Sequence, residues 1–142
     1  MTERIRTIEH GIVYLDFSNR TDPEPDMRLI EEAHRLIAAQ SLGQALVLTD
    51  VSSSKFNQRT IEVLRDFVEA NRPYVRASAL VGLSSITRII FRAVTALTRR
   101  EIRACETRAE AIAYLLSKRV SGPAISAAAS PRTPSGPRGG PR

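Results

Sequence analysis

The centre of the sequence contains two short apolar runs, QALVLTDV (44–51) and ASALVGL (77–83). Apolar runs of about four to eight residues are typical of strands that are covered on both faces. Each run leads through a serine-containing connection into a segment with the apolar spacing of an amphipathic helix. A strand, a helix and a second strand in this order form a crossover between parallel strands. The sequence therefore predicts an α/β fold with parallel strands at its centre.

The segments before the first run predict a hairpin and a helix. IRTIEHGIVYLDFS (5–18) alternates around His10 and Gly11, a pair suited to a turn between two strands. TDPEPDMRLIEEAHRLIAAQ (21–40) begins with acids and prolines and continues with apolar residues at helical spacing. Gly43 marks the expected end of this helical region.

The segments after the second run predict a helix, a strand and a last helix. These are SSITRIIFRAVTALTRR (84–100), EIRACE (101–106) and TRAEAIAYLLSK (107–118), the last with a capping box made by Thr107 and Glu110. The whole order is two strands and a helix, followed by three strand–helix pairs. The predicted fold class is α/β, with a mixed, mostly parallel sheet of about five strands and about four helices.

One domain accounts for most of the chain. Its 142 residues suit a single domain, since domains most often hold roughly 100 to 150 residues. Residues 121–142 hold five of the eight prolines and four of the seven glycines and no aromatic residue, so we expect this segment to be disordered. We therefore predict a folded domain in residues 1–120 and a disordered Pro/Gly/Ser/Arg tail in 121–142.

The net charge of +6 raises the question of an anionic partner, but half of it comes from Arg132, Arg138 and Arg142 in the tail. Aromatic residues make up 5% of the chain and tryptophan is absent, so few rings are available to stack on bases. This composition argues against a nucleic-acid partner.

No apolar run approaches the roughly 18 to 20 residues of a transmembrane segment, and the first ten residues lack the apolar part of a secretory signal. We expect a cytoplasmic protein.

Residues that commonly carry catalysis are sparse. His10 falls in the predicted turn, His34 lies within the first helix, and Cys105 is the single cysteine. One thiol and two distant histidines do not make a metal site. The sequence has no nucleophile elbow, no phosphate-binding glycine loop and no dinucleotide-binding pattern. We expect no enzymatic activity, no metal and no cofactor.

A serine-rich connection follows the first apolar run. The strand end and the connection contain Asp50, Ser52, Ser53, Ser54, Asn57 and Thr60. In an open α/β sheet, ligands and partners usually bind at the carboxyl ends of the strands, where this connection begins. These residues could form a partner-docking loop in which Ser52, Ser53, Ser54 or Thr60 is phosphorylated near a helix start. The alternative is that they hydrogen-bond the turn and cap the helix.

A basic stripe follows the second apolar run. Arg88, Arg92 and Arg99 share a polar face of the third predicted helix. Together with Ser84 and Ser85 at the helix start, Arg88 and Arg92 could hold an anionic headgroup whose apolar part lies in a pocket under the helix. The alternative is a solvated helix face without a specific partner.

Two segments resemble the STAS superfamily (sulfate transporter and anti-sigma factor antagonist), especially its SpoIIAA-like, STAS/SEC14-type bacterial branch. ALVLTDVSSSKFNQRTIEVLRDF resembles the strand, terminal Asp, short loop and helix of that family. ASALVGLSSITRIIFRAVTALTRREIRACETRAEAIAYLL resembles its closing strand, helix, strand and helix, and the resemblance covers about residues 5–118.

This resemblance implies a non-enzymatic signalling domain in which a kinase phosphorylates a serine or threonine at the start of the second helix and releases a bound regulator. The family carries a pattern resembling Asp-Ser-Ser-Gly there, whereas this sequence reads Asn57, Gln58, Arg59, Thr60, and its three serines come earlier. Thr60 is the only hydroxyl in the matching stretch.

Two functions are therefore expected. The first is a bacterial protein-interaction domain of the anti-sigma factor antagonist type, with a regulatory protein such as a kinase or an anti-sigma factor as its partner. The second is a module that binds a small molecule or an anionic lipid through an apolar pocket with a basic rim.

Overall fold

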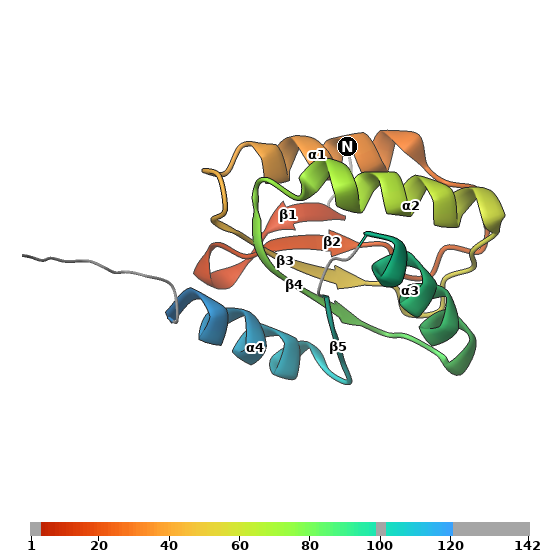
Figure 1. Ribbon diagram of the computed structural model, residues 1–142. Coiled ribbons are helices and arrows are strands. Elements are labelled where there is room, and N and C mark those ends of the chain that lie inside the picture. The colour runs from red at the N-terminus through yellow and green to blue at the C-terminus, as the bar shows by residue number, and fades with distance from the viewer. Residues whose placement is uncertain (1–3, 99–101, 121–142) are drawn as a thin grey trace, which may run out of the picture.

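The computed structural model describes residues 4–98 and 102–120, which form one five-stranded sheet with four α-helices (Figure 1). The strands are β1 (Ile5–Thr7), β2 (Val13–Asp16), β3 (Ala45–Asp50), β4 (Val75–Val81) and β5 (Arg103–Cys105). The helices are α1 (Met27–Ala38), α2 (Gln58–Asn71), α3 (Ser85–Thr98) and α4 (Arg108–Val120), with a short 3-10 turn at Glu9–Gly11. The predicted α/β class is confirmed. The predicted disordered tail, 121–142, lies outside the described residues.

The sheet is mixed in the expected way, with its strands in the order β1-β2-β3-β4-β5. β1 pairs antiparallel with β2, and the later pairs are parallel. The turn between β1 and β2 uses left-handed backbone at His10 (φ 65°) and Gly11 (φ 73°), which reverses the chain within a few residues.

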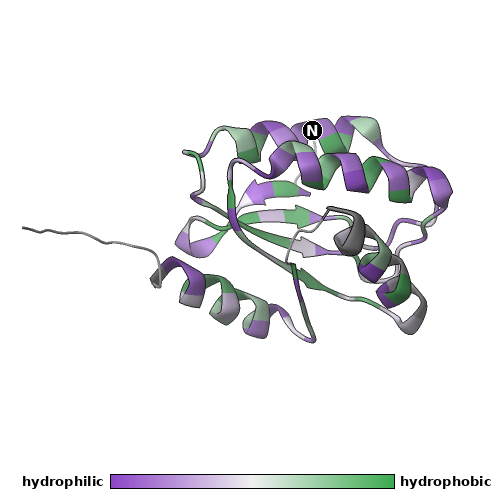
Figure 2. Ribbon diagram, viewed as in Figure 1, coloured by the Kyte–Doolittle hydropathy of each residue, from purple (hydrophilic) through white to green (hydrophobic). Residues whose placement is uncertain are grey.

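The helices are divided unequally between the two faces of the sheet. Each parallel crossover advances the chain by one strand in the same direction, and right-handed crossovers of this kind place their helices on one face. α1, α2 and α3 accordingly lie on one side of the sheet and α4 on the other (Figure 1). Figure 2 shows that α1 and α2 carry both hydrophobic and hydrophilic residues along their length, as amphipathic helices do.

Alternating residues of the central strands supply two separate cores. Val13, Leu15 and Val47 face α1 and α2, while Leu46 and Leu48 face α4 together with Leu115. Leu15, Leu48 and Leu115 have no measurable exposure. The continuous apolar run in β3 is explained by this arrangement, because both faces of the strand are covered.

Side-chain caps set the helix starts close to where the sequence predicted them. Asn57 Oδ1 accepts a hydrogen bond from Thr60 N at 2.8 Å at the start of α2, and Thr107 Oγ1 accepts one from Glu110 N at 3.1 Å at the start of α4. In return, Glu110 Oε1 accepts a hydrogen bond from the backbone N–H of Glu106, one residue before the cap, at 3.0 Å. No helix within the described ranges is long and apolar enough to cross a membrane.

Candidate functional site

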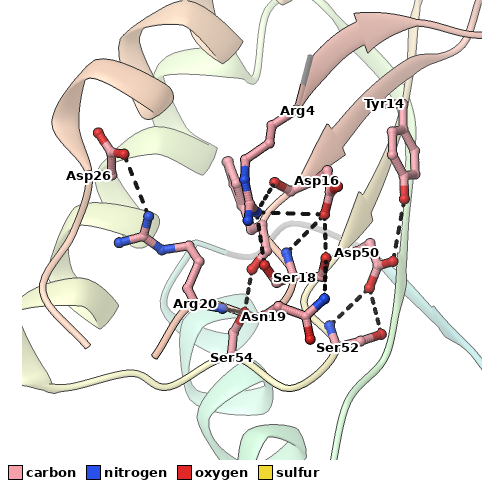
Figure 3. Close-up of polar contacts among 11 residues, drawn as sticks. Arg4, Tyr14, Asp16, Ser18, Asn19, Arg20, Asp26, Asp50, Ser52 and Ser54 are labelled. Carbon is pink, nitrogen blue, oxygen red and sulfur yellow. Dashed lines mark hydrogen bonds and ion pairs between the residues drawn. The ribbon is translucent and has the colours of Figure 1, made fainter. Parts of the chain in front are cut away.

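The parallel strands β2 and β3 end side by side in two similar turns. Asp16 lies beside Asp50 in the register of the sheet. Asp16 Oδ1 accepts hydrogen bonds from the backbone N–H and the hydroxyl of Ser18, and Asp50 Oδ1 accepts the same pair from Ser52 at 2.9 and 2.6 Å (Figure 3). Each aspartate thereby folds the chain back over its own strand end, as Asx turns do.

Both turns continue with a left-handed residue. Asn19 has φ 57° and Ser53 has φ 56°, and each follows the serine of its turn. The sequence signal is a repeated pattern of Asp, apolar residue, Ser and a turn residue, which reads DFSN at 16–19 and DVSS at 50–53. The sequence prediction considered only the second copy, because the first lies at the end of the predicted hairpin.

Hydrogen bonds between the two turns join them into one surface, which we call the strand-end platform (residues 16–20 and 50–55). Phe17 N donates to Asp50 O at 2.9 Å and Asn19 N to Ser52 O at 2.7 Å. Lys55 N donates to Arg20 O at 3.0 Å, further along both segments. The pairing of β2 with β3 is thus extended beyond the ends of the strands.

Most of the predicted phosphorylation sites are held by hydrogen bonds. The Ser52 hydroxyl donates to Asp50, the Ser54 hydroxyl to Phe17 O, and the Thr60 hydroxyl to Pro23 O. Thr60 is also buried, with 8% of its surface exposed. Ser53 is exposed, and its hydroxyl makes no hydrogen bond within the part of the chain that the structure describes.

The end of β4 is packed against the second turn. Val51 N donates to Val81 O at 3.0 Å, and the next residue, Gly82, passes directly over Ser52. Ser84 and Ser85 lie beyond this contact at the start of α3, where the Ser84 hydroxyl accepts a hydrogen bond from Thr87 N at 3.2 Å. Ser84 therefore acts as a helix cap.

Arginine side chains surround the aromatic ring under the platform. The guanidinium carbons of Arg6 and Arg108 lie 4.7 and 5.0 Å from the centre of the Tyr14 ring. The Tyr14 hydroxyl donates to Asp50 Oδ2 at 3.3 Å. Burial raises the pKa of Tyr14, and the negative charges of Asp50 and Asp16 raise it further.

A metal site is absent from the described residues, which contain no cluster of three or more His, Cys, Asp or Glu side chains in position to hold an ion. Cys105 is buried. Burial raises the pKa of its thiol, which favours the unreactive protonated form. His34 Nδ1 lies 2.6 Å from Asn71 Oδ1 between α1 and α2, and neither residue belongs to the platform.

The basic residues of α3 lie over a hollow of about 320 Å³ at the β5 edge of the sheet. Its lining includes Arg88, Arg92, Arg103, Lys118, Phe91 and Tyr114. Arg88 pairs with Glu106 at 3.2 Å. Arg103 and Lys118 lie 5.3 and 5.5 Å from the Tyr114 ring centre, so α4 adds an aromatic ring to these cations beside Phe91 of α3. Arg99 lies outside the described residues.

An apolar cavity of about 110 Å³ lies between α2, α3 and the sheet, where the sequence predicted a pocket under the third helix. Arg88 and Arg92 are not among its described lining residues. They lie in the neighbouring basic hollow, and Phe91 and Ile102 line both spaces. The cavity and the basic side chains are therefore adjacent but separate.

Comparisons with family models, with curated proteins and with solved structures find no match to this chain.

Proposed function

We propose that this protein is a non-enzymatic, cytoplasmic signalling domain that binds a regulatory protein through the strand-end platform. The observation that carries the proposal is the hydrogen bonding between the two Asx turns, through which Phe17, Asn19 and Lys55 hold the two loops together. A surface that is already ordered loses little conformational entropy when a partner binds. The resemblance of the sequence to anti-sigma factor antagonist-type STAS domains supports the same function.

Regulation by phosphorylation would act at Ser53. Among Ser52, Ser53, Ser54 and Thr60, it is the residue that is both exposed and without a hydrogen bond in the described structure. A phosphate there adds about 1.5 to 2 negative charges to the exposed surface of the platform. Those charges would repel an acidic surface of the regulatory protein. A kinase that phosphorylates Ser53 would therefore switch off binding of that protein to the platform.

The experiment compares capture of the partner by wild type, Ser53→Asp and Ser41→Asp. Ser41 is an exposed serine in the loop before β3, at the opposite end of that strand from the platform, and serves as the matched control. We expect Ser53→Asp to lower the recovery of a stoichiometric protein partner from native extract at least several-fold, while Ser41→Asp leaves it unchanged. Equal recovery with all three proteins would refute phosphoregulation at this surface.

Docking itself is tested by Lys55→Glu, which reverses the charge of an exposed platform side chain whose backbone is not left-handed. We expect it to reduce capture of the same partner without changing the melting temperature. Undiminished capture would show that the partner binds elsewhere.

A second candidate, binding of anionic lipid, is favoured by an exposed apolar residue among the arginines of α3. Ile89 is 71% exposed and lies on the same helix as Arg88 and Arg92. An apolar side chain flanked by cations is suited to the interface of an anionic bilayer.

Vesicle flotation tests this candidate with phosphatidylcholine vesicles that contain or lack phosphatidylglycerol. We expect Ile89→Ser and Arg92→Gln to weaken any flotation with the anionic vesicles. Leu42→Ser is the matched control, because Leu42 is 69% exposed in the loop before β3. Flotation unaffected by the α3 substitutions would remove this surface as the lipid contact.

A further inference from the structure

The apolar cavity between α2, α3 and the sheet lies where the sequence predicted a pocket, but neither docking at the platform nor lipid binding by the α3 surface uses it. The wall is mostly apolar and includes Leu15, Val47, Leu64, Phe67, Leu80 and Phe91. Its volume of about 110 Å³ is of the order of an engineered cavity of about 150 Å³ that binds benzene. The space therefore suits a single small ring or a short branched chain.

Four polar side chains interrupt this apolar wall, and one of them, Thr87 of α3, already donates its hydroxyl to Ser84 O at 3.2 Å. Thr49 from β3 and Ser78 from β4 lie on the face of the sheet that carries the cavity, and Asn71 comes from the last turn of α2. The structure records no hydrogen bond for either hydroxyl among the described residues. Asn71 is 4% exposed, and one end of its amide contacts His34, which leaves the other end without a recorded partner.

Buried polar groups without partners are costly, and proteins usually satisfy them with a ligand or an ordered water. Here one buried group of this kind, the Asn71 amide, and two half-buried hydroxyls, those of Thr49 and Ser78, come from three different elements and line one small space. Together they offer both hydrogen-bond donors and acceptors. A hydroxyl group can donate and accept, whereas an amide NH2 group donates and an amide oxygen accepts.

The charge of the cavity determines the class of ligand. None of the described residues that line it is charged; Arg88 and Arg92 lie in the neighbouring hollow. A charged group moved into such a space would lose its hydration without a counter-ion, so an ionised ligand is disfavoured.

We propose that this cavity binds an uncharged molecule, about the size of one six-membered ring, that carries a hydroxyl or carbonyl group bonded by Ser78, Thr49 and Asn71. The proposal does not require protein docking at the platform, but the cavity adjoins it, because Phe17 and Val51, the middle residues of the two Asx turns, line the cavity. Binding is therefore expected to be visible at the platform as well as in the cavity.

The test titrates the full chain with benzyl alcohol, toluene and benzoate, followed by amide chemical shifts. We expect benzyl alcohol to shift amide signals of β3, β4 and α2 in a saturable way. In Ser78→Ala its affinity should fall about fivefold, the effect of one lost hydrogen bond, while the affinity of toluene stays unchanged. Ser117→Ala, at an exposed serine on α4, is the control. Benzoate should not bind in the cavity.

Ser78→Leu provides a second variant, because its larger side chain should fill the cavity and abolish binding of both neutral probes. Its fold is checked by circular dichroism. The proposal is overturned if no probe shifts the cavity signals up to its solubility limit, which would leave the polar groups to ordered water. It is also overturned if Ser78→Ala weakens toluene and benzyl alcohol equally, or if benzoate binds in the cavity as tightly as benzyl alcohol.

Discussion

At the scale of single residues, the platform depends on a close approach between Gly82 and Ser52. A Cβ atom built on Gly82 would lie 2.5 Å from Ser52 N and 2.7 Å from Ser52 Cα, closer than real Cβ contacts. The backbone of Gly82 also has φ +90°, a conformation that side chains disfavour. Glycine is therefore required at this position for two reasons, space and backbone conformation.

We predict that Gly82→Ala destabilises the protein more than Gly43→Ala does. Gly43 has φ +69° but nothing within 4 Å of a built Cβ, so alanine there should cost on the order of 1 kcal/mol in backbone strain alone. The additional clash at Gly82 should cost roughly 1–3 kcal/mol more. The free energies of unfolding are measured with urea. Equal losses for the two variants would mean that Ser52 moves away without cost.

At the scale of elements, each of the four α-helices begins after a residue whose side chain accepts a hydrogen bond from a backbone N–H of the first turn. Asn57 Oδ1 accepts a hydrogen bond from the backbone N–H of Thr60 at 2.8 Å. Its Nδ2 donates to Glu24 Oε2 at 2.7 Å, which connects the start of α2 to the loop before α1. The cap therefore fixes α2 relative to a distant segment as well as starting the helix.

We predict that Asn57→Ala lowers the free energy of unfolding by about 1 kcal/mol, the usual loss for an N-cap. Gln58→Ala is the control, because Gln58 is exposed at the first position of α2 and its recorded contact is with Glu62 on the same helix. Its effect should stay within about 0.5 kcal/mol. Urea unfolding of both variants measures the difference, and a control as destabilised as the cap variant would contradict the capping role.

At the scale of the whole molecule, one sheet connects two cores. The core under α1 and α2 and the core under α4 draw on alternating residues of the same strands, β2 and β3. Damage to either core therefore weakens the strands that the other core uses. We expect the two layers to unfold together.

We predict that Leu115→Ala costs about 2–5 kcal/mol, since Leu115 is fully buried in the α4 core. Leu42→Ala, with 69% of Leu42 exposed, should cost little. Far-ultraviolet circular dichroism and tyrosine fluorescence, which needs no correction because tryptophan is absent, should report one coincident transition. Separate transitions would show that α4 and its core unfold independently.

Local patterns along the chain were sufficient to predict the elements of this fold. The apolar runs, the helical spacing, and the caps at Asn57 and Thr107 each depend on residues within a few positions of one another. Such signals are readable in sequence because the interactions behind them are local. The mixed, mostly parallel sheet followed from the order of these elements and the handedness of crossovers.

The sites depend on contacts between residues far apart in the chain. Asp16 meets Asp50 through the register of two parallel strands, Tyr114 reaches Arg103 from another element, and Asn71 lines the same cavity as Ser78. Neither the register between two strands nor the face on which a side chain lies can be read from one segment alone. A shift of the register by one residue turns every side chain of a strand to the other face. The helices and strands were thus encoded locally, whereas the platform, the basic hollow and the cavity arise from packing.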